Sequence, residues 1–257
     1  MLKCVYIKYL IFIIMTSTTG NKGRFGNQFI RNLAVSLIAE KYNLNVDYYN
    51  KHLFNKLGIN LFSGINTYNN IQSLTDNNYF TIYNCDNLNY DLNPNDAYFQ
   101  TKEFTNFLYN YLHKDIIKSN IIEKNPVNER YNKNNDLFIH IRLGDASIWN
   151  PGITYYINAI KNIKFDNLYI STDDTIHNII TLLLQLYPNA KLIMHDEIYT
   201  IQFATTCKHI ILSHGSFSAT IGYLSFFSNI YYPEYELNKI WYGDMFSIDN
   251  WIKLSVN

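Results

Sequence analysis

Residues 137–145 place the strongest constraint on the fold, because an apolar run ends there in a cluster of polar and charged side chains. The stretch reads Leu-Phe-Ile-His-Ile-Arg-Leu-Gly-Asp. Its short, branched apolar part predicts a strand that is covered on both faces of a parallel sheet. His140 and Arg142 come near the carboxyl end of that strand, and a Gly-Asp turn at Asp145 stops it.

A charged group at the end of a parallel strand is placed where open α/β sheets bind their ligands. The guanidinium of Arg142 carries a planar fork of donors, which suits a phosphate better than the point charge of a lysine does. Taken alone, the stretch is equally compatible with a structural pairing of Arg142 with Asp145. The rest of the chain decides between these two interpretations.

The second half of the chain alternates between strand and helix patterns. Strands are expected at 137–142, 168–171, 191–194, 209–212 and 230–232, and helices at 153–162, 175–187, 200–206 and 217–227. Alternation of this kind predicts a parallel, doubly wound sheet.

The first half opens with an apolar run at 9–15, a glycine-containing loop at 16–28, and helical spacing of apolar residues from 29 to 42. A strand, a glycine loop and a helix are typical of the start of a Rossmann-like unit. Gly23 and Gly26 allow a tight turn and the close approach of a ligand to the backbone. The apolar run also resembles the core of a signal peptide, but cleavage there would leave the loop without its strand, so we favour a strand.

Residues 43–100 are less regular, and short strands with long loops are expected, including Val46–Tyr48 and Tyr79–Tyr83. One helix is predicted over 104–122 and a polar linker over 128–135. We therefore expect an α/β fold of two Rossmann-like domains that face a cleft, with parallel sheets. The first domain would span residues 1–130, on the acceptor side, and the second residues 131–257.

Composition excludes several classes of function. The 257 residues carry a formal net charge of +0, which argues against a nucleic-acid footprint or a polybasic membrane patch. An anionic ligand must then be held by local donors. Three well-separated cysteines, Cys4, Cys85 and Cys207, argue against a disulfide framework and against a thiolate metal site, and they favour a reducing compartment.

Three polar segments follow strands of the second half and would share one edge of its sheet. They are 140–145, 171–174 and 213–218. The last has small hydroxyl residues and a glycine where a helix begins, so backbone N–H groups and the helix dipole would point at an anion. An ordinary serine N-cap is the alternative interpretation.

Asp173 and Asp174 could cap the next helix, bind a divalent ion, or accept hydrogen bonds from a ribose or base. A metal is disfavoured, because the chain has no Asp-x-Asp sequence and no cluster with zinc spacing. A Walker P-loop is missing as well, which disfavours an NTPase.

Four motifs together resemble those of family 11 glycosyltransferases, the α-1,2-fucosyltransferases, with wider kinship to α-1,6- and protein O-fucosyltransferases. The motifs are Gly23-Arg-Phe-Gly-Asn-Gln-Phe29, His140-Ile-Arg-Leu-Gly-Asp145, Tyr169-Ile-Ser-Thr-Asp-Asp174 and Ser213-His-Gly-Ser-Phe-Ser218. They occur in the order seen in that family and cover both halves of the chain. The resemblance implies a GT-B fold in which the second domain binds GDP-fucose without a metal.

Roles follow from the resemblance position by position. It implies that His140 and Arg142 are catalytic, with Arg142 on the pyrophosphate and His140 near the sugar–phosphate bond. The implied donor-binding residues are Arg142, Asp145, Asp173, Asp174, Ser213, Ser216, Phe217 and Ser218. The implied cleft residues from the first domain are Gly23, Gly26, Asn27 and Gln28.

Two positions depart from the family pattern. Leu143 stands where the central motif has a second arginine, and Ala219-Thr220 stands where aromatic residues are usual. A different donor sugar, a different acceptor or reduced activity would each fit these changes.

The resemblance predicts an inverting, metal-independent transferase that moves fucose from GDP-fucose to a glycan hydroxyl. Such a transferase would need no cofactor, because GDP-fucose is its donor substrate. Its partners would be the nucleotide-sugar donor and a glycan acceptor, without nucleic acid and without a transmembrane span; peripheral membrane association stays open. We expect a cytoplasmic protein, or one in a viral or host-cell glycosylation compartment. The alternatives are a transferase with another donor and a catalytically silent glycan- or nucleotide-binding module.

Overall fold

The computed structural model describes residues 16–234 and 243–256. The strands are β1 Ser17–Thr18, β2 Val46–Asp47, β3 Ile71–Ser73, β4 Asp91–Asn93, β5 Leu137–Ile141, β6 Leu168–Thr172, β7 Lys191–Leu192, β8 His209–Ile211, β9 Asn229–Pro233 and β10 Ile252–Leu254. The α-helices are α1 Phe25–Tyr42, α2 Lys51–Lys56, α3 Tyr79–Tyr83, α4 Lys102–Leu112, α5 Asp115–Lys124, α6 Ile153–Lys161, α7 Asn178–Leu186, α8 Glu197–Ala204 and α9 Ser216–Tyr223. Two 3₁₀ helices, η1 Asn128–Arg130 and η2 Gly144–Trp149, complete the set.

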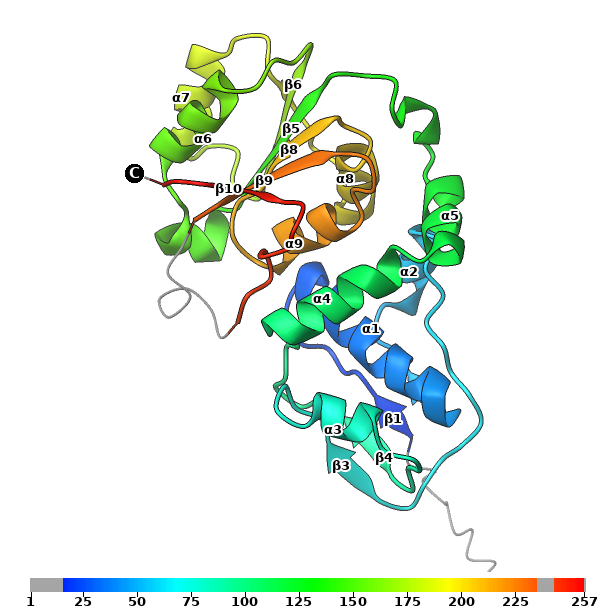
Figure 1. Cartoon of the computed structure of the whole chain (residues 1–257). Coiled ribbons are helices and arrows are strands. Elements are labelled where there is room, and N and C mark those ends of the chain that lie inside the picture. The colour runs from blue at the N-terminus through cyan, green and yellow to red at the C-terminus, as the bar shows by residue number, and fades with distance from the viewer. Residues whose placement is uncertain (1–15, 235–242, 257) are drawn as a thin grey trace, which may run out of the picture.

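A six-stranded sheet with the order β10-β9-β8-β5-β6-β7 organises the second half, and every pair of neighbours in it is parallel. Helices α6 and α7 lie on one side of the sheet and α8 and α9 on the other (Figure 1). Within this sheet β5 is the first strand in the sequence. Strands β6 and β7 follow on one side of it, and β8, β9 and β10 then follow on the other side. This is a Rossmann-like order, and its direction reverses between β5 and β8.

Strand β5 is buried along its whole length, as its apolar sequence predicted. Leu137, Ile139 and Ile141 face one core cluster together with α6 and α7, whereas Phe138 faces the larger cluster on the other side. Coverage of both faces explains the nearly continuous apolar run. The predicted alternation of strands and helices in the second half is confirmed, and β10 is an addition that the pattern did not predict.

The first half is less regular, and only part of its prediction is confirmed. The glycine-loop helix is present as α1, and β1 pairs with β2 and β3 with β4 in two small parallel sheets. The strand expected at 9–15 lies outside the described residues. A two-domain GT-B arrangement is therefore not established by these elements.

Two predictions for the first half are wrong. Tyr79–Tyr83 forms helix α3 instead of a strand, and the rings of Tyr79 and Tyr83 stack one helical turn apart, with centroids separated by 6.1 Å. The single helix expected at 104–122 is two helices, α4 and α5. The chain turns between them at His113, whose Nε2 lies 3.1 Å from the carbonyl oxygen of Tyr223.

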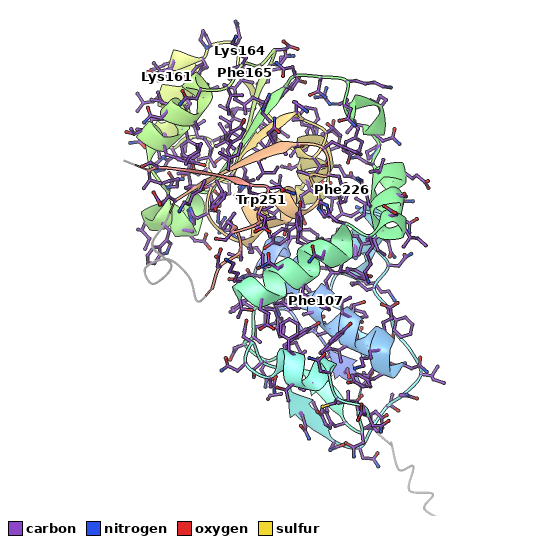
Figure 2. The ribbon with its side chains drawn as sticks, in the orientation of Figure 1. Phe107, Lys161, Lys164, Phe165, Phe226 and Trp251 are labelled. Carbon is purple, nitrogen blue, oxygen red and sulfur yellow. The ribbon has the colours of Figure 1, made fainter. Side chains whose placement is uncertain are left out.

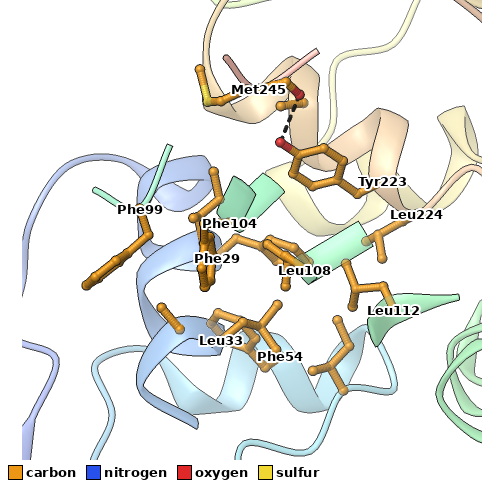
Figure 3. Packing of buried hydrophobic residues seen from close by; sticks show 14 of the residues in the cluster. Phe29, Leu33, Phe54, Phe99, Phe104, Leu108, Leu112, Tyr223, Leu224 and Met245 are labelled. Atoms are coloured by element: carbon orange, nitrogen blue, oxygen red, sulfur yellow. Dashed lines mark hydrogen bonds between the residues drawn. The ribbon is translucent and has the colours of Figure 1, made fainter. Parts of the chain in front are cut away.

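The larger core cluster includes residues from both sides of the predicted boundary near residue 130. Figure 3 shows Phe29, Phe104 and Leu108 of the first half packed beside Tyr223 of α9, whose hydroxyl donates to the carbonyl oxygen of Met245 at 2.9 Å. Trp251 lies at the same junction (Figure 2), with its ring 5.8 Å from that of Tyr223. The halves therefore share a hydrophobic core, and the boundary stays a prediction.

In the part of the chain that the structure describes, no helix is long and apolar enough to cross a membrane.

Candidate functional site

A cavity of about 650 Å³ opens at the carboxyl ends of β5, β6 and β8. This position is the point at which the strand order reverses, where open α/β sheets bind ligands. Its lining residues are Gly23, Arg24, Phe25, Gly26, Asn27, Gln100, His140, Arg142, Asp145, Ala146, Trp149, Ser171, Thr172, Asp173, His195, Glu197, Thr200, His214, Gly215, Ser216, Phe217 and Met245. Segments of all four sequence motifs are among them.

The first turn of helix α9 forms one wall of the cavity. Gly215 is the N-cap, with a φ of 90° that suits glycine, and no described side chain caps the helix. The alternative interpretation of 213–218, an ordinary serine N-cap, is therefore wrong. Ser216 instead donates from Oγ to Oδ1 of Asn27 at 2.6 Å. Gly215, Ser216 and Phe217 line the cavity, and no described side chain accepts from the cap of this helix.

The first turn of α1 meets the first turn of α9 at this wall. A Cβ on Gly26 would collide with the backbone nitrogen of Phe217, so the glycine allows two helices to touch, not a ligand to approach. This corrects the role expected for Gly26. The contact is held by Asn27, which also accepts from Nε2 of Gln100 at 3.0 Å. Two helix N-termini, each with a partial positive charge, are thereby brought to the same cavity.

Four charged side chains form a closed ring of ion pairs in the cavity, which we call the charge ring: Arg24, Arg142, Asp145 and Asp173. Arg142 bonds both carboxylates. Arg24 lies 2.9 Å from Asp173 and 3.4 Å from Asp145. The structural pairing of Arg142 with Asp145, left open by the sequence, is thus present within a larger network that joins the two halves.

Asp173 is the firmly held member of the charge ring. Its Oδ1 accepts from the backbone N–H of Leu143 at 2.8 Å, and a Cβ on Gly144 would come within 2.6 Å of its Oδ2. Burial acts to raise the pKa of Asp173, but the Leu143 hydrogen bond and the charges of Arg142 and Arg24 outweigh it and lower the pKa below its usual value. The carboxylate is ionised at neutral pH.

His140 lies at the end of β5 with its ring almost fully buried. Its Nδ1 is 2.6 Å from Oγ of Ser218, and the ring packs against Phe217 with centroids 5.0 Å apart. Burial lowers the pKa of His140 to about 3, so the ring is neutral at physiological pH. Nδ1 is thereby engaged, and Nε2 has no hydrogen-bond partner among residues 16–234 and 243–256.

A second buried histidine, His214, braces the loop before α9. Its Nε2 lies 3.1 Å from the carbonyl oxygen of Ala146, and its Nδ1 lies 3.3 Å from Oγ of Ser213. Burial lowers the pKa of His214 to about 4. Ser213 is fully buried and also contacts the hydroxyl of Tyr156 at 3.0 Å. This network fixes the loop from beneath.

Several residues predicted for the site are near the cavity but do not line it. Ser213 and Ser218 are buried in the networks just described. Asp174 caps a turn through Ile176, whose N–H donates to its Oδ1 at 3.2 Å. Gln28 donates from Nε2 to the carbonyl oxygen of Gly23 at 2.7 Å and so supports the glycine loop. Ser213, Ser218 and Gln28 each bond a residue that lines the cavity.

Residue 143 does not line the cavity, although the resemblance to the family motif indicated that a cation was missing there. The side chain of Leu143 is fully buried in the smaller core cluster. A second guanidinium is present nevertheless, supplied by Arg24 from the other half. Sequence reasoning missed Arg24 because it weighed the glycines and amides of the first motif, although a charged residue just before a helix was a usable signal.

The far wall of the cavity was also missed. It includes Trp149 at the end of η2, and His195 and Glu197 at the start of α8. These residues follow β5 and β7, so they belong to the same sheet edge as the predicted segments. The indole ring of Trp149 gives that wall a stacking surface, and the carboxylate of Glu197 gives it a hydrogen-bond acceptor.

Within residues 16–234 and 243–256, no group of three or more His, Cys, Asp or Glu side chains could hold a metal ion. Cys85 and Cys207 are free thiols, and burial raises the pKa of Cys207 to about 12. Metal independence of the site stays a prediction.

The fold and site define an α/β protein with a Rossmann-like parallel sheet and a charged cavity at its switch point. In comparisons with known proteins, no family model matches this chain and no curated protein matches it.

Proposed function

We propose that this chain is an inverting, metal-independent glycosyltransferase that transfers fucose from GDP-fucose to a glycan hydroxyl. In this proposal residues 1–130 and 131–257 form the two Rossmann-like domains of a GT-B enzyme. The donor occupies the cavity at the end of β5, and the acceptor approaches from the first half.

The observation that carries the proposal is the meeting of all four fucosyltransferase-like motifs in one cavity. Residues from 23–27, 140–145, 171–173 and 214–217 line it, although they are far apart in the sequence. A chance resemblance in four separate segments would not require them to converge. The cavity volume of about 650 Å³ is also within the range of small-molecule sites.

The chemistry of the proposed reaction matches the charges that meet there. As the bond between the sugar C1 and the β-phosphate oxygen breaks, negative charge grows on the leaving GDP. Arg142, Arg24 and the N-terminus of α9 would stabilise that charge in a partly dry site. The acceptor oxygen forms the new bond to C1 from the opposite face, and its proton leaves to solvent or to a base.

His140 has a restricted role in this mechanism. Its pKa of about 3 makes it a poor base at neutral pH, so it would act by hydrogen bonding through Nε2 near the sugar–phosphate bond. Glu197 is an exposed carboxylate in the cavity that could accept a proton.

Two alternatives remain as competing proposals. A transferase with another nucleotide-sugar donor would use the same phosphate wall and a different far wall. A silent binding module would keep the cavity without turnover. Leu143 no longer favours the module, since its side chain is in the core.

One experiment separates these proposals. The protein is incubated with GDP-fucose, GDP-mannose or UDP-glucose, in EDTA and in manganese, and GDP or UDP release and nucleotide binding are measured. Slow release from GDP-fucose in EDTA is the expected result. Release from another donor favours the second proposal, binding without release favours the module, and binding of none of the nucleotides contradicts all three.

A further inference from the structure

The charge ring divides into a fixed pair and an exposed pair. The side chains of Arg142 and Asp173 are 17% and 23% exposed, whereas those of Arg24 and Asp145 are 60% and 64% exposed. Asp173 is also held by the backbone of Leu143. The carboxylate of Asp145 makes its described hydrogen bonds and ion pairs with the two arginines alone.

The ring has no net charge as it stands. Two guanidinium groups face two carboxylates, so the cations that would attract a phosphate are already neutralised. A diphosphate that enters the cavity meets both arginines and also the carboxylates that pair with them. Like charges at this range repel, because the wall of the cavity screens them less than bulk water does.

Asp145 is the member of the charge ring whose side chain can move away from the two arginines. It belongs to η2, which contains a backbone irregularity at Ala146, and its side chain is mostly in solvent. Asp173 cannot leave without losing its bond to the Leu143 N–H and its fit against Gly144. Departure of Asp145 would free donors on Arg142 and Arg24 on the solvent side of the ring, which is the side that a ligand enters.

We infer that Asp145 is a resident anion, a carboxylate that occupies the place between Arg24 and Arg142 that a phosphoryl group of the ligand takes when it binds. The identity of that ligand as a nucleoside diphosphate rests on the proposed function. Asp145 on this account competes with the donor and does not bind it. It balances the charge of the two arginines until a ligand arrives.

The test measures binding of GDP and of inorganic pyrophosphate to the full chain by calorimetry at low and high salt. Asp145→Asn keeps the size of the side chain and removes its charge. We expect the variant to bind both probes roughly 3- to 10-fold more tightly at low salt, since two partly exposed ion pairs no longer compete. The gain should shrink at high salt. Asp145→Ser gives the same result if charge is the cause.

Asp196→Asn is the matched control. Asp196 lies between the cavity residues His195 and Glu197, and it caps α8 by accepting from Tyr199 N–H at 2.7 Å, a role that asparagine also fills. The Asp196→Asn substitution removes the same charge near the cavity but outside the charge ring. The affinity of this variant for GDP and pyrophosphate should therefore change little.

The outcomes separate the inference from the proposed function. If the wild type binds GDP and Asp145→Asn binds it equally or less tightly, the resident-anion role is wrong and the proposed function stands. An equal gain in Asp196→Asn would also overturn it, because the effect would then be general charge. If neither the wild type nor the variant binds either probe, both proposals are wrong, whereas binding by the variant alone supports both.

Discussion

Arg142 is the residue on which the phosphate assignment depends most directly. We expect Arg142→Ala to weaken GDP binding and to slow transfer by about a hundred- to a thousand-fold, since loss of one donor at a developing anion costs about 2.7–4 kcal/mol. Arg142→Lys should restore only part of this, because the bidentate fork is lost. Binding calorimetry and donor turnover measure both effects.

Arg130→Ala is the control for Arg142. Arg130 makes a comparable, partly buried ion pair with Asp136 at 2.7 Å, but it does not line the cavity. Both variants should lose some stability, and only Arg142→Ala should lose GDP affinity. Unchanged GDP affinity in Arg142→Ala would remove the phosphate assignment.

His140 should make stability depend on pH. Its pKa is near 6.5 when the chain is unfolded and about 3 when folded, so between these values the unfolded state binds more protons. Stability is therefore full above pH 6.5 and falls as the pH drops toward 3, by several kcal/mol in total. His214, lowered to about 4, acts in the same direction.

Denaturant unfolding from pH 7.5 to 4.5 measures this dependence. His140→Gln should flatten part of the slope, because an amide keeps a polar contact with Ser218 but does not titrate. His52→Gln, at an exposed histidine outside the cavity, should leave the slope as in the wild type. Equal slopes in all three proteins would mean that the buried imidazole does not set the pH dependence.

At the residue scale, sequence patterns located the site better than they described it. Arg142 and Asp173 line one cavity, as expected from the rule that the ends of parallel strands share one edge of a sheet, whereas their role stays a prediction. The pairing of Asp173 with Arg24 could not be derived, since it depends on how the glycine loop packs against a distant strand. Likewise Leu143 was interpreted as a missing cation because the family motif has an arginine at that position, whereas its side chain is buried in the core.

At the element scale, the contact between α1 and α9 shapes the phosphate wall. Gly26→Ala should destabilise the protein by about 3 kcal/mol or more, because the new methyl group would overlap the backbone at Phe217 and force the helices apart. GDP affinity should fall as well, since both helix N-termini would move. Thermal unfolding and calorimetry test this.

Gly20→Ala separates steric overlap from loss of glycine freedom. Gly20 has a φ of 57° but no atom lies within 4 Å of the position that a Cβ would take. It should therefore cost only about 1 kcal/mol of backbone strain. A Gly26→Ala variant that was no less stable than Gly20→Ala would contradict the close helix contact.

Elements were predicted well where a long pattern repeated and poorly where a short one was judged alone. Strands β5, β6, β8 and β9 were predicted because each carries an apolar run next to a helix. The short β7 is at most partly buried, and β10 was not predicted. Tyr79–Tyr83 was taken for a strand because five aromatic-rich residues do not reveal their period. Its packing partners, Phe99, Phe104 and Phe107, come from later segments and decided for a helix.

At the scale of the whole molecule, the shared core predicts how the halves unfold. Leu108 in α4 belongs to the larger cluster and Leu183 in α7 to the smaller one, and both are fully buried. Because the larger cluster runs from α1 and α4 into α9, a loss of packing in one half should be felt by the other. The chain should therefore unfold as one cooperative unit.

Differential scanning calorimetry on the wild type, Leu108→Ala and Leu183→Ala tests whether the chain unfolds as one unit. Each truncation should cost about 2–5 kcal/mol, and both should move the same single transition to lower temperature. If the two predicted domains were independent, the wild type would show two transitions, and each variant would shift only its own. A ligand adds a second check, because GDP should raise the whole transition when the cavity spans one cooperative unit. Two transitions, with only one moved by GDP, would mean that the charge ring joins two separately folding domains.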